Sequence, residues 1–237
     1  MNTQPQDHIV KSYDQEQHRL HAEILRMGEM AVAQLEAALD VVDRRDDKAA
    51  ERIIANDEAI DALEQEVSHD VMRLALRGPI ASDLRVILAA LRIASDIERV
   101  GDYASNVAKR SMALNLSPPV PHTMGLRALG GMAVHQMRDV LTAYRNMDVE
   151  AAQRVRASDA DLDAQYTGLF RELLTYMMED ARNITPCTHL LFMAKNLERI
   201  GDHATNIAEN IWFRVHGETM LPPREKRDET NTSAGIP

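Results

Sequence analysis

Two segments of this chain carry nearly the same sequence one hundred residues apart, and this repeat constrains the fold more than any other feature. Residues 94–109 read ASDIERVGDYASNVAK, and residues 194–209 read AKNLERIGDHATNIAE. A self-match of this density at a fixed period is typical of a duplicated structural unit. Eight of the 16 aligned pairs are identical without a gap: Ala94/Ala194, Glu98/Glu198, Arg99/Arg199, Gly101/Gly201, Asp102/Asp202, Ala104/Ala204, Asn106/Asn206 and Ala108/Ala208.

The repeat extends towards the N-terminus of each half. Residues 55–76 match residues 157–178 at an offset of 102, which pairs Asp57 with Asp159 and Asp61 with Asp163. The offset changes from 102 to 100 between the two matches, so the intervening turn differs in length by two residues.

The repeated segments are expected to be helical. Apolar residues of the first copy recur in steps of four and three, at Ile93, Ile97, Val100, Ala104 and Val107, and no proline interrupts them. The whole chain is 45% hydrophobic but only 4% aromatic, which favours packed helices over a β-sandwich. We therefore expect an all-α protein.

The helix pattern predicts two tandem three-helix bundles with internal duplication. The bundles are expected at residues 8–116 and 122–217, each with its own core, followed by a disordered tail at residues 218–237. The Pro-rich stretch Ser117–Pro121 is the expected linker. The expected helices are 7–44, 46–76 with an aspartate N-cap, 82–114 capped by Ser82, 122–146, 149–179, and 185–217 opened by Thr185-Pro186.

Each copy of the repeat keeps Glu-x-x-x-Asp-x-x-x-Asn, which places three oxygen-bearing side chains on one helix face. They are Glu98, Asp102 and Asn106 in the first copy, and Glu198, Asp202 and Asn206 in the second. Like charges four residues apart destabilise a helix unless a cation lies between them. Retention of this cost in both copies favours a metal site over a merely structural repeat.

The preceding helix of each half offers a further pair of acidic residues. If antiparallel helices align, Asp57 and Asp61 join the first stripe, and Asp159 and Asp163 join the second. All-oxygen sites suit hard cations such as Mg²⁺, Mn²⁺ or Ca²⁺ and also accept iron. The metal therefore stays open among these cations and zinc. The Glu-x-x-x-Asp-x-x-x-Asn stripes of the repeat are expected to lie off the apolar face, and Asn106 and Asn206 are weaker candidates than the carboxylates.

Three further features could suggest other sites. Glu66 and His69 form a Glu-x-x-His motif of di-iron bundles, but it is not duplicated, so it is not favoured as a ligand pair. His203 is an additional candidate ligand of the second site only, because its counterpart is Tyr103. Cys187 is the single cysteine, which excludes an internal disulfide and fits a reducing cytoplasm.

Composition excludes several classes of function. The net charge of −10 and the lack of a basic stripe argue against direct nucleic-acid binding. The chain contains no apolar run of 18 residues, its first residues do not form a signal peptide, and it has no phosphate-cradling glycine loop. We therefore expect a cytoplasmic protein.

The chain resembles the PhoU family over roughly residues 8–217. The resemblance rests on the segments Ile97–Asp102 and Leu197–Asp202, on the helix start Ala81–Arg85, and on Thr175–Asp180. It implies a pair of three-helix bundles with metal-binding Glu/Asp-x-x-x-Asp motifs, which fall here on Glu98/Asp102 and Glu198/Asp202, with Asp57/Asp61 and Asp159/Asp163 as weaker matches.

The resemblance also implies a function. Family members are expected to be cytoplasmic, often dimeric, negative regulators of the phosphate-starvation response and modulators of high-affinity phosphate uptake. The implied partners are the ATPase of the phosphate ABC transporter and a membrane sensor histidine kinase. The leading hypothesis is thus a non-enzymatic metal-binding adaptor. The alternatives are a carboxylate-metal hydrolase of phosphate esters and a structural bundle whose acidic stripes are solvated.

Overall fold

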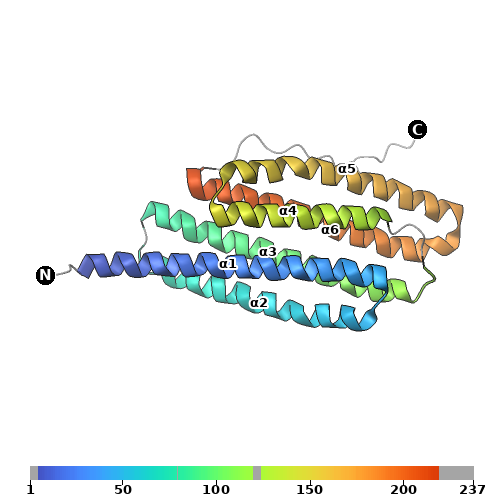
Figure 1. Ribbon diagram of the computed structural model, residues 1–237, viewed down its shortest axis with the longest axis horizontal. Coiled ribbons are helices and arrows are strands. Elements are labelled where there is room, and N and C mark those ends of the chain that lie inside the picture. The colour runs from blue at the N-terminus through green and yellow to red at the C-terminus, as the bar shows by residue number, and fades with distance from the viewer. Residues whose placement is uncertain (1–4, 79, 120–123, 219–237) are drawn as a thin grey trace.

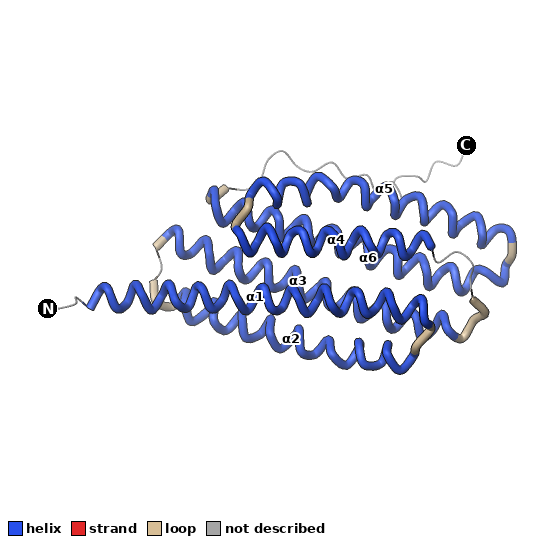
Figure 2. The backbone as a smooth tube through the Cα atoms, viewed as in Figure 1, coloured by secondary structure: helices blue, strands red, loops and turns tan. Residues whose placement is uncertain are grey.

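The chain folds entirely into helices over the residues that the computed structural model describes, which are 5–78, 80–119 and 124–218. Two sets of three helices follow one another along the chain, so the expected all-α, internally duplicated fold is confirmed (Figures 1 and 2). Except for Glu218, the tail expected at 218–237 lies outside the described residues. The elements are α1 (Pro5–Arg44), α2 (Asp47–Ala75), α3 (Ala81–Asn115), α4 (Met124–Asn146), α5 (Val149–Glu179), the 3₁₀ turn η1 (Ala181–Asn183) and α6 (Ile184–His216).

The turn between the first and second helix has the same construction in both halves. The side chain of Asp46 accepts a hydrogen bond of 3.0 Å from the backbone N–H of Ala49 at the start of α2, and that of Asp148 accepts one of 2.9 Å from Ala151 at the start of α5. Each aspartate satisfies a backbone donor that the helix leaves unpaired. The expected aspartate cap of the second helix is therefore present, and its duplicate opens the fifth.

Other helix ends depart from the sequence prediction. Ser82 does not cap α3, because the helix begins one residue earlier and Ile80 occupies the N-cap position without a side-chain hydrogen bond. The sixth helix is preceded by η1, in which the Asp180 carboxylate accepts from the Arg182 N–H at 2.9 Å. Gly217 ends α6 in the left-handed conformation, with φ of 81°, a conformation that glycine adopts without the strain of a Cβ atom.

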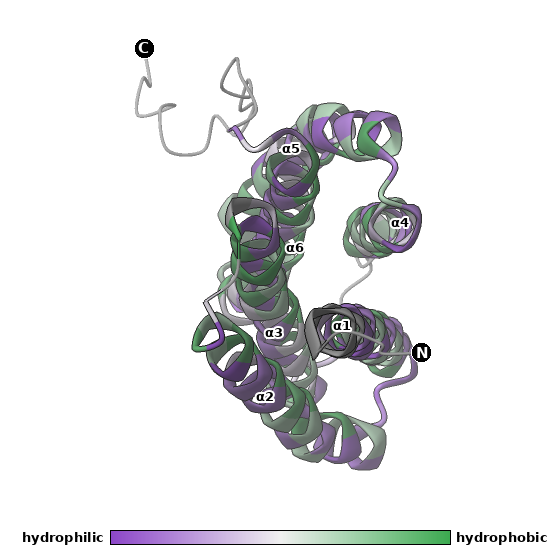
Figure 3. Cartoon of the chain, turned by 90° about the vertical axis from the view of Figure 1, so that its left-hand side faces the viewer, coloured by the Kyte–Doolittle hydropathy of each residue, from purple (hydrophilic) through white to green (hydrophobic). Residues whose placement is uncertain are grey.

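The six helices form two layers, which are clearest in the end-on view of Figure 3. Helices α5, α6, α3 and α2 follow one another in a curved layer, and α4 and α1 cover its concave side. Helix α3 packs on α6 as extensively as on the helices of its own half. The two centres of sequence repetition therefore lie side by side in the middle of the molecule.

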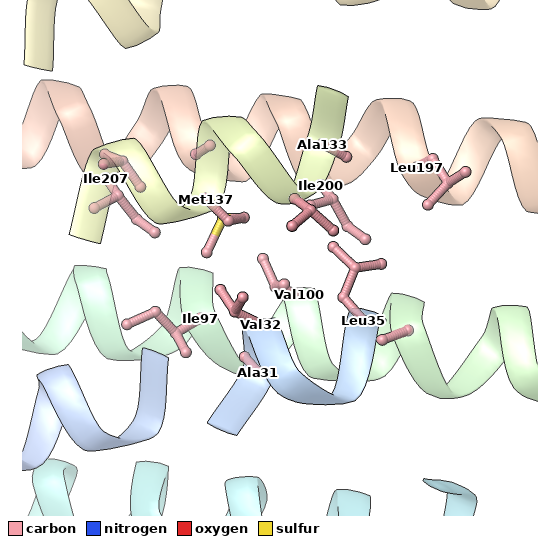
Figure 4. Close-up of a cluster of buried hydrophobic side chains, with 14 of the residues drawn as sticks. Ala31, Val32, Leu35, Ile97, Val100, Ala133, Met137, Leu197, Ile200 and Ile207 are labelled. Carbon is pink, nitrogen blue, oxygen red and sulfur yellow. The ribbon is translucent and has the colours of Figure 1, made fainter. Parts of the chain in front are cut away.

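The buried apolar side chains of both halves form one continuous cluster. Figure 4 shows Leu35 of α1 and Val100 of α3 beside Met137 of α4 and Ile200 of α6, all of them buried. The expectation of a separate core in each bundle is therefore not met. The two halves share one core, because the apolar faces of α3 and α6 cover each other.

The contact between α1 and α4 has pseudo-two-fold symmetry. A Cβ atom at Gly28 would lie within 3 Å of the Leu141 side chain, and a Cβ atom at Gly130 would lie within the same distance of the Leu39 side chain. Gly28 and Gly130 are 102 residues apart, as are Leu39 and Leu141. Each half therefore supplies a glycine that accepts the leucine of the other half, and larger residues at 28 and 130 would push the helices apart.

Candidate functional site

The first group of sequence-predicted site residues lies between α2 and α3. Asp57 and Asp61 come from α2, and Glu98 and Asp102 come from α3. The structure brings two of these carboxyl groups close enough to feel the charge of their neighbours: Asp57 and Asp102 act on Asp61, and Asp61 and Asp102 act on Glu98. The antiparallel alignment of the two helices expected from sequence is therefore present in this half.

Electrostatic repulsion within this group is visible in two pKa shifts. Burial raises the pKa of the Glu98 carboxyl, and the charge of Asp102 raises it further. Burial likewise raises the pKa of Asp61, with Asp57 and Asp102 adding to the effect. Because like charges disfavour the ionised form, a cation placed here would be stabilised by the same groups.

Arg99 partly supplies that cation. Its Nε atom lies 3.1 Å from Glu98 Oε2, and its Nη1 atom lies 2.7 Å from Asp102 Oδ2. The guanidinium therefore bridges the two residues that the sequence identified as the strongest ligand pair. A metal ion that used the same oxygens would compete with Arg99 for them.

Gln34 of α1 completes the first site and was not identified from sequence. Its amide Nε2 donates to Asp57 Oδ1 at 2.7 Å and to the backbone carbonyl of Gly101 at 3.2 Å. Gly101 matters because a Cβ atom there would lie 3.3 Å from Asp57 Oδ1 and 3.0 Å from the Ile60 side chain. The motif glycine thus makes room for a carboxylate from the neighbouring helix.

The second group repeats this arrangement between α5 and α6. A Cβ atom at Gly201 would lie 2.9 Å from Asp159 Oδ1 and 2.9 Å from Oε1 of Gln136, which is the α4 counterpart of Gln34 at an offset of 102. Asp163 comes from α5 and Asp202 from α6, as in the first half. The same three-helix environment is therefore built twice, with a glutamine, two aspartates and the motif glycine in equivalent places.

The second group is far more buried than the sequence suggested. Asp159, Asp163 and Glu198 expose 3%, 2% and 3% of their surface, so the expectation that the stripes of the repeat lie off the core is wrong for Glu198. Lys195 Nζ lies 2.8 Å from Glu198 Oε1 and 5.0 Å from the centre of the Tyr166 ring. Ser95 occupies the corresponding position of the first copy, so this internal cation distinguishes the two sites.

The asparagines of the motif and His203 point elsewhere. Asn206 Nδ2 donates to Asp96 Oδ1 of α3 at 3.1 Å, and His203 Nδ1 lies 2.7 Å from the same oxygen. The His203 ring also faces its counterpart Tyr103, with 5.6 Å between ring centres. These residues join the two halves at the α3–α6 contact, while no hydrogen bond links Asn106 to the carboxylates within the described part of the chain.

The geometry of the donors decides whether a metal ion fits these groups. Across residues 5–78, 80–119 and 124–218, no three His, Cys, Asp or Glu side chains converge in a group that could hold an ion. The donor chemistry nevertheless suits a hard cation, because the first site holds carboxyl groups from two helices and Arg99 pairs with only two of them, Glu98 and Asp102. The residues fit a metal in charge and ligand type.

The described helices include none that is both long and apolar enough to cross a lipid bilayer. The family model described as "PhoU domain" matches this chain twice, at residues 24–111 and 126–211. Each match spans three helices and includes one of the two sites.

Curated relatives match the chain over nearly its full length. It is 72% identical over 231 residues to a protein of Xylella fastidiosa (strain 9a5c) named "Phosphate-specific transport system accessory protein PhoU homolog", a match covering 98% of each chain. It is 46% identical to the protein of that name in Caulobacter vibrioides (strain NA1000 / CB15N), covering 94% of this chain and 97% of the relative. The crystal structure of PhoU from Pseudomonas aeruginosa superposes with a TM-score of 0.84 at 32% identity, covering 87% of this chain and all of the other.

Proposed function

This chain belongs to the PhoU family of non-enzymatic accessory proteins of phosphate-specific transport systems, and on that premise we propose that it is a negative regulator of the phosphate-starvation response. It modulates high-affinity phosphate uptake as a cytoplasmic adaptor between the phosphate transporter and a sensor histidine kinase. The observation that carries this proposal is the match over 98% of the chain to a phosphate-specific transport accessory protein. Because the family is non-enzymatic, the alternative of a phosphate-ester hydrolase is not favoured.

Exposed apolar side chains support the adaptor role. Met72, Leu76 and Ile80 expose 64%, 81% and 69% of their surface where α2 ends and α3 begins. Their counterparts Leu174 and Met178 are exposed at the end of α5, at the opposite end of the molecule (Figure 1). Clusters of exposed apolar residues commonly mark protein contacts, so the repeated hairpin tips are our proposed surfaces for the ATPase, the kinase or a second copy in a homodimer.

A deletion strain tests the regulatory role directly. Loss of the gene should raise expression of phosphate-uptake and alkaline-phosphatase genes in phosphate-rich medium, and the wild-type gene on a plasmid should restore repression. Normal repression in the deletion strain would contradict the proposal. A paired affinity purification, with the wild-type chain and with Leu76→Ser/Met178→Ser as bait, tests whether the hairpin tips bind the transporter ATPase and the kinase. Equal recovery of both partners by the two baits would exclude the tips as the contact surface.

We further propose that the carboxylate groups hold divalent metal or iron. The ligands would come from Glu98, Asp102, Asp57 and Asp61 in the first site and from Glu198, Asp202, Asp159 and Asp163 in the second. The raised pKa of Glu98 and of Asp61 supports this proposal, because it comes first from burial and then from neighbouring carboxylates whose charge Arg99 only partly offsets. A bound cation would stabilise the α2–α3 and α5–α6 contacts and so fix the scaffold that partners recognise.

A further inference from the structure

A cavity of about 380 Å³ lies where the N-terminal part of α1 passes the C-terminal ends of α4 and α6, away from both carboxylate groups. Polar side chains from three helices converge on it. They include Gln17, His18 and His21 of α1, Arg145 and Asn146 of α4, and Arg214 of α6.

This cavity breaks the internal symmetry of the fold. Helix α1 has 40 residues and α4 has 23, and at an offset of 102 the first residue of α4, Met124, corresponds to position 22 of α1. Residues 5–21 of α1 therefore have no counterpart in α4. Every α1 residue that lines the cavity lies in this extension, so the duplicated fold itself does not require the cavity.

Two arginines, Arg145 and Arg214, line the cavity, and Asp14 is the one acidic residue among its described lining residues. Arg214 Nη1 lies 3.5 Å from His21 Nδ1, and the Arg214 guanidinium carbon lies 5.9 Å from the centre of the Tyr144 ring. Within the described ranges no carboxylate forms an ion pair with Arg214, whereas Arg145 pairs with Glu29 at 2.6 Å. Two arginines that line one cavity repel each other, and an anion bound between them would offset that repulsion.

His21 and Tyr144, which adjoin Arg214, do not supply that anion. Burial lowers the pKa of His21, and the charge of Arg214 lowers it further, so His21 is neutral at pH 7. Burial raises the pKa of Tyr144 to about 12, so its phenol is also neutral. The carboxylate that lines the cavity is that of Asp14, an exposed residue on α1.

Helix dipoles explain part of this charge distribution. Arg145 and Arg214 lie in the last turns of α4 and α6, where a cation offsets the partial negative charge of the helix end. That effect accounts for the position of each arginine along its own helix. It does not explain why the two arginines line the same cavity, together with the imidazoles of His18 and His21 and the amides of Gln17 and Asn146.

We propose that this cavity binds a small oxyanion of the phosphate class, held by the guanidinium groups of Arg214 and Arg145. Guanidinium presents paired N–H donors that match the oxygens of phosphate. The amides of Gln17 and Asn146 and the imidazole of His18 add donors of the kind that complete such a site. This function goes beyond the proposed regulatory role and is measured on the purified protein without partners, so either one can fail without the other.

Isothermal titration of the full-length protein with inorganic phosphate, at ionic strength held constant with chloride, tests the site. The wild type should bind phosphate saturably, and Arg214→Gln should weaken binding about ten-fold or more, as expected for the loss of a charged hydrogen-bond donor. Asp14→Asn should tighten binding because it removes the opposing charge. Arg154→Gln, which removes an exposed arginine of α5 outside the cavity, should bind like the wild type.

Two results would overturn the proposal. One is a wild type that binds no phosphate saturably, and the other is an equal loss of affinity in Arg214→Gln and Arg154→Gln, which would mean that net charge alone attracts the anion. Arg145→Gln provides a second variant if Arg214→Gln fails to fold by circular dichroism. A competition experiment with glycerol phosphate distinguishes two specificities of the site. If glycerol phosphate displaces inorganic phosphate, the site accepts phosphoryl groups in general, and if it does not, the site accepts only the free ion.

Discussion

Asp159 packs directly against the backbone of Gly201: a Cβ atom at position 201 would lie only 2.9 Å from the Asp159 Oδ1 atom. Real Cβ atoms do not approach an oxygen so closely, so a larger residue at 201 would move the buried carboxylate or separate α5 from α6. The glycine of the repeated motif is therefore explained by the neighbouring helix and not by its own.

Gly201→Ala is expected to lower the free energy of unfolding by about 1–3 kcal/mol, the usual cost of overpacking a core. Helix propensity alone predicts the opposite sign, since alanine is favoured over glycine by about 1 kcal/mol in a helix interior. Gly131→Ala in α4 is the matched control, because nothing lies within 4 Å of its added Cβ atom, and it should stabilise the protein. Urea unfolding curves of both variants measure the two effects, and a stabilised Gly201→Ala protein would refute the steric explanation.

Metal content should depend on the duplicated motif. We expect Glu98→Gln/Asp102→Asn/Glu198→Gln/Asp202→Asn to lose the divalent metal or iron that elemental analysis finds in the wild type. The control variant Glu51→Gln/Glu150→Gln/Asp161→Asn/Glu179→Gln removes the same charge from exposed positions and should keep the metal. Equal metal content in the two variants would rule out these ligands.

Arg99 is expected to compete with a metal ion for Glu98 and Asp102. Arg99→Gln should lower the melting temperature in EDTA by about 2–4 °C, a loss near 1 kcal/mol for a chain of this size, and added Mn²⁺ should restore it. Lys109→Gln removes an exposed cation from the same helix and should respond less to Mn²⁺. A melting temperature of Arg99→Gln that is the same in EDTA and in Mn²⁺ would argue against a cation at this position.

The lowered pKa of His21 is expected to make the folded protein less stable as the pH falls. Its pKa in the folded protein lies below the unfolded value near 6.5, so the unfolded state takes up a proton first as the pH falls. The contribution of His21 to stability is therefore complete above pH 6.5 and is lost as the pH falls from 6.5 through the folded pKa. Melting temperatures at pH 7.5 and 5.5 should differ less in His21→Gln than in the wild type, by roughly 2 °C for a partly exposed group. The exposed His69→Gln is the control, and an equal pH response in the wild type and His21→Gln would contradict the assignment.

A fragment of residues 124–218 should not behave as a stable monomer. Removal of the first half exposes the apolar face of α6 that includes Ile200 and Ile207, both fully buried in the intact chain. We expect the fragment to self-associate in size-exclusion chromatography. A monomer with a cooperative melt would show that the second bundle needs no help from the first.

Much of the fold was accessible from sequence, because the self-match is dense where α3 and α6 lie. The repeat of α1 in α4 was missed, although Gly28, Gln34 and Leu39 recur at an offset of 102 as Gly130, Gln136 and Leu141. Those identities are scattered among ordinary core residues, so they form no recognisable motif without the helix contacts. Extending the alignment backwards at the same offset pairs Gln34 with Gln136, but only the helix contacts show that Gln34 reaches Asp57.

The candidate site was predictable in its carboxylates but not in its cations or its depth. Nothing in the repeat marks Lys195, because its counterpart Ser95 carries no charge. The burial of Glu198 could not be read from the period of one helix, since it depends on how far α5 covers α6. The link from His203 to Asp96 joins positions 107 residues apart and follows only from the packing of the two halves.

Gly28 contacts Leu141, and their repeat counterparts Gly130 and Leu39 contact each other. This is the contact pattern of a symmetric complex between two identical chains, in which residue i of one chain meets residue j of the other, and residue j of the first meets residue i of the second. A chain with a single three-helix unit would form this contact with its own copy, and one mutation would alter both ends of the interface at once. Fusion of the two units into one polypeptide ended that constraint. Each end can now change alone, so the first half can carry a longer first helix while the second half carries Arg145 and Arg214, whose counterparts in the first half are Asp43 and Leu114.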